Sequence, residues 1–344
     1  MTHALKVAAI QLDAAPAPTL DRLARAEQLI VEAAHAGAQL IALPELFNLG
    51  YTYSNDNYHR AETLNGLTAT WMREIASRLK IHLAGSLLLM DRANIYNALL
   101  LFAPDGRMWR YNKNYPWGWE RAYFREGHDI TIAHTDLGDI GLMICWDVAH
   151  PSLWKRYAGQ IDLMLISSCP PDVSNPIFHF PNGERVTFDQ MGPFVRKIKD
   201  VGQRVFGEGI NRQAAWLRIP AIHASVAGTI TTSIPNAHGS MLVFAPFAPK
   251  LIKYLPQAHQ LKMTCDMIRG SKVVDAGGNV LAKLNDGEGF IFTNITLAEK
   301  KPQPNGTQPK RSAPWLSYFA SDVMLPLIVR STYRHRPDRS SQSA

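Results

Sequence analysis

The stretch IGLMICWDVAHP, residues 140–151, joins an apolar run to a polar turn that contains an acid and a histidine. Cys145 stands where the apolar run ends, whereas a purely structural cysteine is expected inside such a run. Reactive groups are commonly presented on the connections that follow regular elements. The pattern therefore predicts a strand that delivers Cys145 to a site, with a small buried hydrophobic cysteine as the alternative.

On both sides of this stretch, short apolar runs alternate with helical patterns. Helices are predicted at 19–38, where apolar residues recur at helical spacing, and at 68–80. Strands are predicted at 5–12, 39–46, 81–90, 97–104, 107–113, 139–146 and 161–168. Several of these runs are apolar throughout, so both faces of at least one sheet must be covered. This order of elements predicts an α/β layered fold.

The second half of the chain is less regular. A turn at 276–279 predicts a hairpin, with 288–295 as its return strand. No linker divides the chain clearly. We therefore expect one domain over residues 1–299, with an insertion around 170–269, followed by a C-terminal extension over residues 300–344.

Composition narrows the class of protein. The chain has 344 residues, of which 46% are hydrophobic and 19% charged, as in globular proteins with a sizeable core. Its three cysteines form no disulfide framework and favour a reducing, cytoplasmic location. No signal peptide or membrane span is predicted. The net charge of +7 comes with no nucleic-acid motif, so solvated helix faces and tails are the preferred explanation.

Three chemically active side chains share one placement, because Glu45, Lys113 and Cys145 each end an apolar run. If those strands are neighbours, the three side chains meet at one edge of the fold. A carboxylate can take the proton of a thiol, and an ammonium can stabilise the negative charge that develops during attack. Taken singly, each has a plainer explanation: a turn acid, a solvated lysine or a buried thiol.

Taken together, three stretches resemble the signatures of the nitrilase, or carbon–nitrogen hydrolase, superfamily. They are LIALPELFNLGY (40–51), YNKNYPWGWERAYFREG (111–127) and GLMICWDVAHP (141–151). The resemblance resumes at 270–295. It implies a four-layer α-β-β-α sandwich and a homodimer or higher homo-oligomer. It also implies Glu45 as general base, Lys113 as oxyanion stabiliser and Cys145 as nucleophile.

The same resemblance implies two further roles and a mechanism. Glu120 would orient the substrate or assist proton transfer, and the Trp146 backbone N–H would help to hold the oxyanion. Cys145 would attack a carbon bonded to nitrogen, and a thioester would then be hydrolysed. No cofactor or metal is expected, since the histidines show no ligand spacing of the HExxH kind.

The order Cys145-Trp146-Asp147 is more similar to amidases and N-carbamoyl amide hydrolases than to true nitrilases, which tend to have Cys-Trp-Glu. We therefore expect a small linear amide or carbamoyl substrate. A nitrilase and an amine-accepting acyltransferase of the same fold remain the alternatives.

Two regions depart from the family pattern. In 211–228, Trp216 and Leu217 stand where a polar pair is usual, and 229–269 resembles an insertion. Its proline and aromatic residues suggest an apolar pocket wall or lid, with a surface loop as the alternative. The tail 314–339 is apolar and then basic, which fits a dimer interface better than a membrane-surface helix because Asp322 and Pro326 interrupt it.

Overall fold

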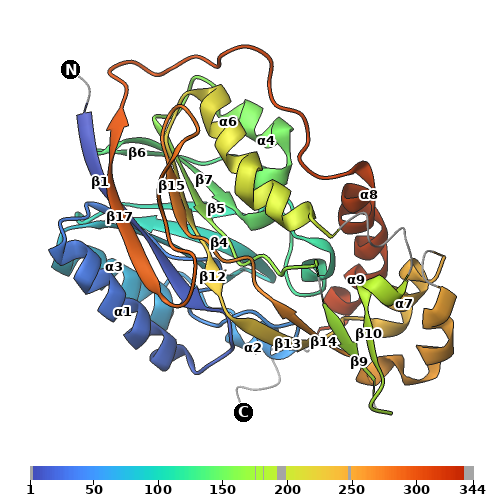
Figure 1. The fold of residues 1–344 in the computed structure, drawn as a ribbon. Coiled ribbons are helices and arrows are strands. Elements are labelled where there is room, and N and C mark those ends of the chain that lie inside the picture. Colours follow the sequence, from blue (N-terminus) through green and yellow to red (C-terminus); the bar gives the residue numbers. More distant parts are fainter. Residues whose placement is uncertain (1–2, 175, 181, 192–198, 247–248, 337–344) are drawn as a thin grey trace.

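Two β-sheets form the centre of the molecule in this computed structural model (Figure 1), which describes residues 3–174, 176–180, 182–191, 199–246 and 249–336. The first sheet has seven strands in the order β12-β1-β2-β3-β4-β5, and β17 pairs with β1. Its members are β1 (His3–Asp13), β2 (Leu40–Ala42), β3 (His82–Asp91), β4 (Asn94–Phe102), β5 (Met108–Asn112), β12 (Val226–Ala227) and β17 (Gly289–Leu297). The strands predicted near the amino terminus therefore all belong to one sheet.

The second sheet has six strands in the order β16-β15-β11-β8-β7-β6. Its members are β6 (Ile132–Thr135), β7 (Gly138–Ile144), β8 (Leu163–Ser167), β11 (Ala221–Ala224), β15 (Lys272–Val274) and β16 (Val280–Lys283). β7, β8 and β11 run parallel, and β8 is buried along its whole length. A parallel sheet of this kind needs cover on both faces.

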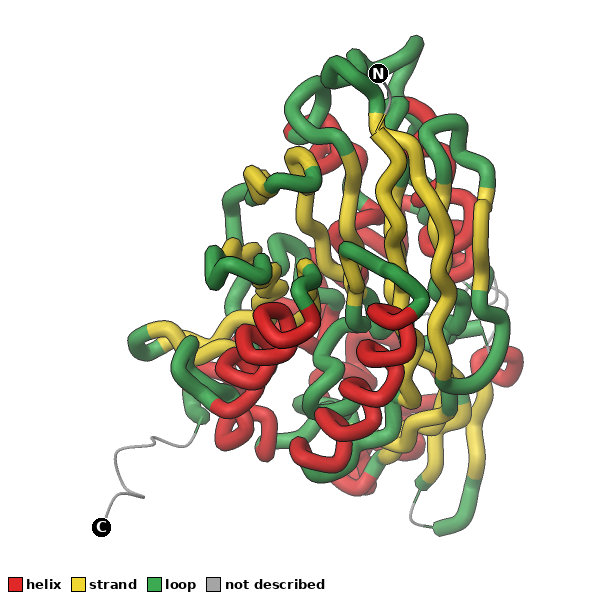
Figure 2. Tube along the Cα trace, turned by 90° about the vertical axis from the view of Figure 1, so that its left-hand side faces the viewer, coloured by secondary structure: helices red, strands yellow, loops and turns green. Residues whose placement is uncertain are grey.

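The two faces of β1 show how the layers are built. Val7 and Ala9 share a buried cluster with residues of the second sheet, whereas Ala8 and Ile10 share one with Ile30 of helix α1 (Thr19–His35). This alternation follows from the two-residue period of a strand. Helices lie on the outer face of each sheet, so the fold is the predicted four-layer α-β-β-α sandwich (Figures 1 and 2). The outer helices are α1 (Thr19–His35), α3 (Leu67–Leu79), α4 (Pro151–Arg156) and α6 (Ile210–Leu217).

The predicted hairpin near the end of the chain is wrong in its second strand. β15 turns back into β16 at residues 280–283, within the second sheet. The segment 288–295 instead lies in β17, which pairs antiparallel with β1 in the other sheet. The sequence suggested otherwise because β16 is short and mostly exposed, so it has no clear apolar pattern.

A smaller, four-stranded sheet lies beside the sandwich. Its order is β10-β9-β14-β13, and these strands come from the region that was predicted to hold an insertion. The elements are β9 (Ile177–His179), β10 (Arg185–Thr187), β13 (Thr229–Ser233) and β14 (Lys262–Asp266), with α7 (Ala237–Phe244) and the 3₁₀ helix η5 (Pro249–Gln260). Within the same region, α6 and β11 belong to the main sandwich.

The C-terminal segment is helical and packs against its own chain. It consists of α8 (Trp315–Tyr318), the π-helical η6 (Phe319–Met324) and α9 (Leu325–Arg334). The Tyr333 hydroxyl accepts a hydrogen bond from the N–H of Ile95 at 2.9 Å. The C-terminal segment also exposes four large apolar side chains: Trp315, Phe319, Val323 and Leu327. The homo-oligomer stays a prediction, and no helix within the described residues is both long and apolar enough to cross a membrane.

Candidate active site

The strand that leads to Cys145 ends two residues earlier than the predicted strand at 139–146. β7 stops at Ile144, and Cys145 begins a short 3₁₀ turn, η2 (Cys145–Ala149). Cys145 has a φ of +49°, in the left-handed region that residues with a side chain rarely adopt. Such conformations persist only where the surrounding structure enforces them, and they cluster at functional sites.

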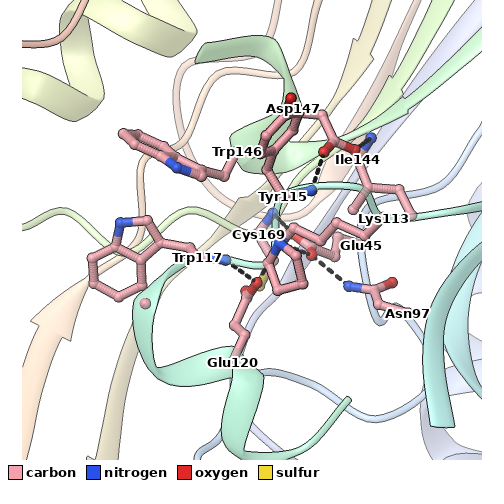
Figure 3. A network of polar contacts seen from close by, with 12 residues as sticks. Glu45, Asn97, Lys113, Tyr115, Trp117, Glu120, Ile144, Trp146, Asp147 and Cys169 are labelled. Atoms are coloured by element: carbon pink, nitrogen blue, oxygen red, sulfur yellow. Dashed lines mark hydrogen bonds and ion pairs between the residues drawn. The ribbon is translucent and has the colours of Figure 1, made fainter. Parts of the chain in front are cut away.

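Two further predicted residues follow strands of the other sheet. Glu45 comes shortly after β2, and Lys113 directly follows β5. The Lys113 Nζ donates to Glu45 Oε1 at 2.7 Å, and neither side chain has any exposed surface. Asn97 Nδ2 donates to the same oxygen at 2.7 Å (Figure 3). The Glu45 carboxylate is therefore fixed by charge and by a neutral donor.

Glu120 joins this cluster from the 3₁₀ turn η1 (Gly118–Ala122). Its Oε2 accepts from Lys113 Nζ at 2.6 Å and from the Trp117 backbone N–H at 2.7 Å. Its Oε1 accepts from the Tyr51 hydroxyl at 3.0 Å. One buried ammonium thus lies between two buried carboxylates, as Figure 3 shows. We refer to Glu45, Lys113 and Glu120 as the charged cluster.

The close packing of these groups changes their protonation. Burial lowers the pKa of Lys113, but Glu120 and Glu45 outweigh burial and raise that pKa well above its usual range. Burial raises the pKa of Glu120, and Glu45 adds to this effect while Lys113 opposes it. Burial also raises the pKa of the Cys145 thiol, with Glu45 adding and Lys113 opposing. Near neutral pH the lysine is therefore charged and the thiol is neutral.

One backbone group connects Cys145 to Glu45. The N–H of Cys169, just after β8, donates to Glu45 Oε2 at 2.8 Å. The backbone of Cys169 also lowers the pKa of the Cys145 thiol, which partly offsets the effect of burial. Cys145, Glu120 and Trp146 also line one common cavity. Thus every predicted site residue lies either in the charged cluster or on the wall of this cavity.

Asp147 was expected only as a residue that distinguishes the amidase-like members of the superfamily from true nitrilases. In the structure it positions two segments of the site. Its buried carboxylate accepts from the Tyr111 hydroxyl at 2.7 Å and from the Ile144 N–H at 3.0 Å. It also accepts from the N–H groups of Asn114 and Tyr115, at 3.1 and 2.8 Å. Asp147 therefore ties the turn that carries Cys145 to the loop that follows Lys113.

Comparison with known proteins identifies the family of the chain. The family model for carbon-nitrogen hydrolases matches residues 6–304, which is most of the chain. The chain belongs to the carbon-nitrogen hydrolase family.

Curated relatives of the chain include both nitrilases and amidases. A nitrilase of Pyrococcus abyssi is 30% identical over 159 residues, which is 45% of this chain and 60% of the relative. An omega-amidase of Xenopus laevis is 30% identical over 168 residues, covering 45% and 59%. A deaminated glutathione amidase of Synechocystis is 32% identical over 170 residues, covering 44% and 61%. The matches to such relatives span only about half to three fifths of their length.

Solved structures share the fold at low sequence identity. The CN-hydrolase superfamily protein XC1258 of Xanthomonas campestris has a TM-score of 0.61 at 18% identity, covering 86% of this chain and 91% of the other. Nit3 of Saccharomyces cerevisiae, a member of the nitrilase superfamily, has a TM-score of 0.61 at 21% identity, covering 85% and 89%. An amidase of Nesterenkonia has a TM-score of 0.60 at 20% identity, covering 84% and 89%.

The C-terminal segment reaches the turn that carries Cys145. Asp322 Oδ1 accepts from the Trp146 indole Nε1 at 3.1 Å, and Asp322 Oδ2 lies 2.9 Å from His150 Nε2. His150 also stacks on Tyr115, with ring centroids 3.5 Å apart. The sequence had suggested Asp322 only as a break in an apolar tail. Its contacts lie 172 and 176 residues away along the chain, so no local pattern could have revealed them.

Proposed function

We propose that this protein hydrolyses the carbon–nitrogen bond of a linear amide or an N-carbamoyl amide through a thioester on Cys145. The observation that carries this proposal is the buried Lys113 between Glu45 and Glu120, with Cys145 on the wall of a cavity that Glu120 also lines. A thiol nucleophile, a carboxylate base and a fixed ammonium are the groups that such a reaction needs.

In the first half of the reaction, Glu45 takes the proton of the neutral Cys145 thiol while the sulfur attacks the carbonyl carbon. A carbon–sulfur bond forms, and the carbonyl electrons move to oxygen. Lys113 and the Trp146 N–H stabilise that oxyanion. The second position of a helical turn suits this role, because its N–H has no partner within the turn. Glu45 then gives its proton to the nitrogen as the carbon–nitrogen bond breaks, and ammonia or an amine leaves.

In the second half, Glu45 accepts a proton from water, and the hydroxide attacks the thioester carbon. A second oxyanion forms at the same place. It collapses with loss of the sulfur, which recovers its proton from Glu45, and the carboxylic or carbamic acid leaves. The raised pKa of Cys145 fits this cycle, because the resting thiol keeps its proton until a base removes it during attack.

Glu120 is the second carboxylate partner of Lys113, so the ammonium keeps one ion-pair partner when Glu45 becomes protonated. It also lines the cavity with Cys145, where an oxygen not engaged by Lys113 is able to meet an amide N–H of the substrate. We propose it as an aid to substrate orientation. Asp147 after Trp146 supports an amide rather than a nitrile, by resemblance to amidases of the superfamily.

The decisive experiment compares Cys145→Ala with the wild type on amides, carbamoyl amines, carbamoyl amino acids and nitriles, scored by ammonia release. We expect wild-type turnover of an amide or carbamoyl compound and a loss on the order of 10⁴-fold or more in Cys145→Ala. Cys265→Ala, which removes another buried thiol, is the matched control and should keep its activity. Turnover of nitriles alone would assign the nitrilase alternative. An added amine that captures the acyl group would indicate the acyltransferase.

A further inference from the structure

The cavity beside Cys145 is the first of three that adjoin one another. It shares four lining residues with its neighbour: Trp117, Trp146, Val173 and Val201. That neighbour shares Trp119, Phe178 and Phe244 with a third cavity further out. We refer to the second and third cavities together as the apolar chamber, whose walls include Trp119, Phe178, Phe244, Met263 and Leu325.

Much of the apolar chamber is built by segments that lie outside the four-layer sandwich. Phe178, Met263 and Phe244 come from β9, β14 and α7, which lie outside the four-layer sandwich. Leu325 comes from α9 of the C-terminal segment, and it is buried. The sandwich and its loops therefore supply the charged cluster, whereas the chamber combines Trp117, Trp119 and Trp146 of the family motifs with side chains from the smaller sheet, α7 and the C-terminal segment.

The chemistry of the walls excludes charged occupants. Among the described residues, the lining of the chamber contains no Asp, Glu, Lys, Arg or His. A carboxylate placed there would lose its hydration without gaining a partner, which costs several kcal/mol or more. An apolar group would gain about 25 cal/mol for each Å² removed from water. The chamber therefore disfavours a charged group whatever the shape of that group.

The serine hydroxyls of the chamber are mostly occupied. Ser240 Oγ accepts from the Trp119 Nε1 and donates to the Pro235 carbonyl, and Ser321 Oγ accepts from the Gly118 N–H. Ser317 Oγ is buried, lines the chamber and has no hydrogen-bond partner within the described part of the chain. It is therefore available for one polar atom of an otherwise apolar ligand.

We infer that the substrate carries, on its scissile carbon, a large uncharged apolar group that occupies the apolar chamber. This inference rests on the proposed function, because the ammonia or amine must leave while the group attached to the acyl carbon stays on Cys145. The substrate class is then an amide or carbamoyl compound with an aromatic or branched aliphatic group. A carboxylated amide is a poor substrate.

The test measures kcat/KM for 3-phenylpropanamide, for succinamate, which carries a carboxylate, and for acetamide, which is too short to reach the chamber. We expect 3-phenylpropanamide to exceed succinamate by about 100-fold or more, which corresponds to burial of one aromatic side group. Phe244→Ala should reduce the preference for 3-phenylpropanamide over acetamide by about tenfold. Phe244→Leu should reduce it less, and this milder variant covers the case in which Phe244→Ala does not fold.

A matched control lies on the same helix. Leu242 is 55% exposed on α7, so Leu242→Ala should leave the substrate preference unchanged. A second measurement avoids catalysis: calorimetry should detect binding of 3-phenylpropan-1-ol to the wild type and to Leu242→Ala, and weaker binding to Phe244→Ala.

The two readouts separate the two proposals. Hydrolysis of acetamide, with succinamate as good a substrate as 3-phenylpropanamide and no binding of the alcohol, would overturn the chamber inference alone. Binding of the alcohol without hydrolysis of any amide would refute the proposed function and support the apolar chamber as a ligand site.

Discussion

The charged cluster and the apolar chamber adjoin each other but are stabilised in opposite ways. The cluster buries Glu45, Lys113 and Glu120 completely or nearly so, and each charge is matched by a partner. The chamber has no ionisable side chain among its described lining residues. A buried charge is tolerated only when its partners are present, whereas an apolar wall tolerates exchange of one hydrophobic side chain for another.

The two regions therefore differ in which substitutions they tolerate. A substitution in the cluster changes the charge balance of every member, so the cluster permits few alternatives. A substitution in the chamber alters shape and volume locally, so the chamber is free to differ among proteins that share the same chemistry. The comparison predicts that stability depends steeply on the cluster and weakly on the chamber.

The largest effect is expected for Lys113→Met, which leaves Glu45 and Glu120 buried without their shared cation. Removing one partner from a buried ion pair typically costs about 3–5 kcal/mol in folding free energy. Urea unfolding should therefore show a lower free energy of unfolding by that amount.

Leu325→Met in the chamber is the control for this comparison, because it also places a methionine at a buried position. A volume-conserving change of this kind usually costs less than about 1.5 kcal/mol. Adding Glu120→Gln to Lys113→Met should restore part of the lost stability, since it removes one uncompensated charge. Equal stability of Lys113→Met and Leu325→Met would contradict the difference drawn between the two regions.

A smaller effect is expected where the C-terminal segment meets the site. Asp322→Asn removes the charge that faces His150 and weakens the hydrogen bond from Trp146, whose indole lines both the cavity with Cys145 and the chamber. Two partly buried hydrogen bonds of this kind contribute about 1–2 kcal/mol. The free energy of unfolding should fall by that amount, and activity on large amides should fall more than activity on acetamide.

Glu126→Gln is the matched control at the same interface. Glu126 pairs with Arg330 of the C-terminal segment at 2.9 Å, but both side chains are substantially exposed. Such surface pairs contribute about 0–1 kcal/mol. If the two variants lost equal stability, the contacts of Asp322 with the turn that carries Cys145 would contribute no more to stability than a surface ion pair does.

The sequence was informative where chemistry coincides with local pattern. Cys145, Glu45 and Lys113 each end an apolar run, and the turn after Lys113 supplies Glu120 only seven residues later. Strand periodicity therefore predicted an α/β layered fold, and the resemblance of three short motifs to the nitrilase superfamily implied the four-layer sandwich and the members of the cluster.

The sequence was uninformative where function depends on contacts between distant segments. The hydrogen bond from Asn97 to Glu45 spans 52 residues, and that from the Cys169 N–H spans 124. The backbone donor carries no residue signature at all. The return strand at 288–295 was misassigned for a related reason: its pairing with β1 joins the two ends of the domain, and a nearer turn offered a simpler explanation. The chamber was predicted only as an apolar wall, because its occupant depends on which elements meet.

The smallest effect expected is a change in pH dependence when Glu120 is replaced by Gln. An amide at this position still accepts from Lys113 and the Trp117 N–H through its oxygen, and its NH₂ group donates to the Tyr51 hydroxyl. The fold should therefore survive. Burial raises the pKa of Glu120 in the folded protein above its ordinary value of 4.5. Between those two values the folded chain binds a proton that the unfolded chain has released, so this carboxyl contributes stability at low pH that is lost as the pH rises.

Urea unfolding of the wild type and Glu120→Gln from about pH 4 to pH 8 tests this sign. The stability advantage of the wild type over the variant should be greatest at the acid end and decline as the pH rises. Glu27→Gln provides a control of opposite sign, because the Arg78 hydrogen bond lowers the pKa of Glu27 at the surface. The advantage that Glu27 gives should decline as the pH falls. If the stability advantage of the wild type changed with pH in the same direction for both variants, burial beside Glu45 would not govern the protonation of Glu120. The cluster would then behave like an ordinary surface ion pair, against the difference drawn between the cluster and the chamber.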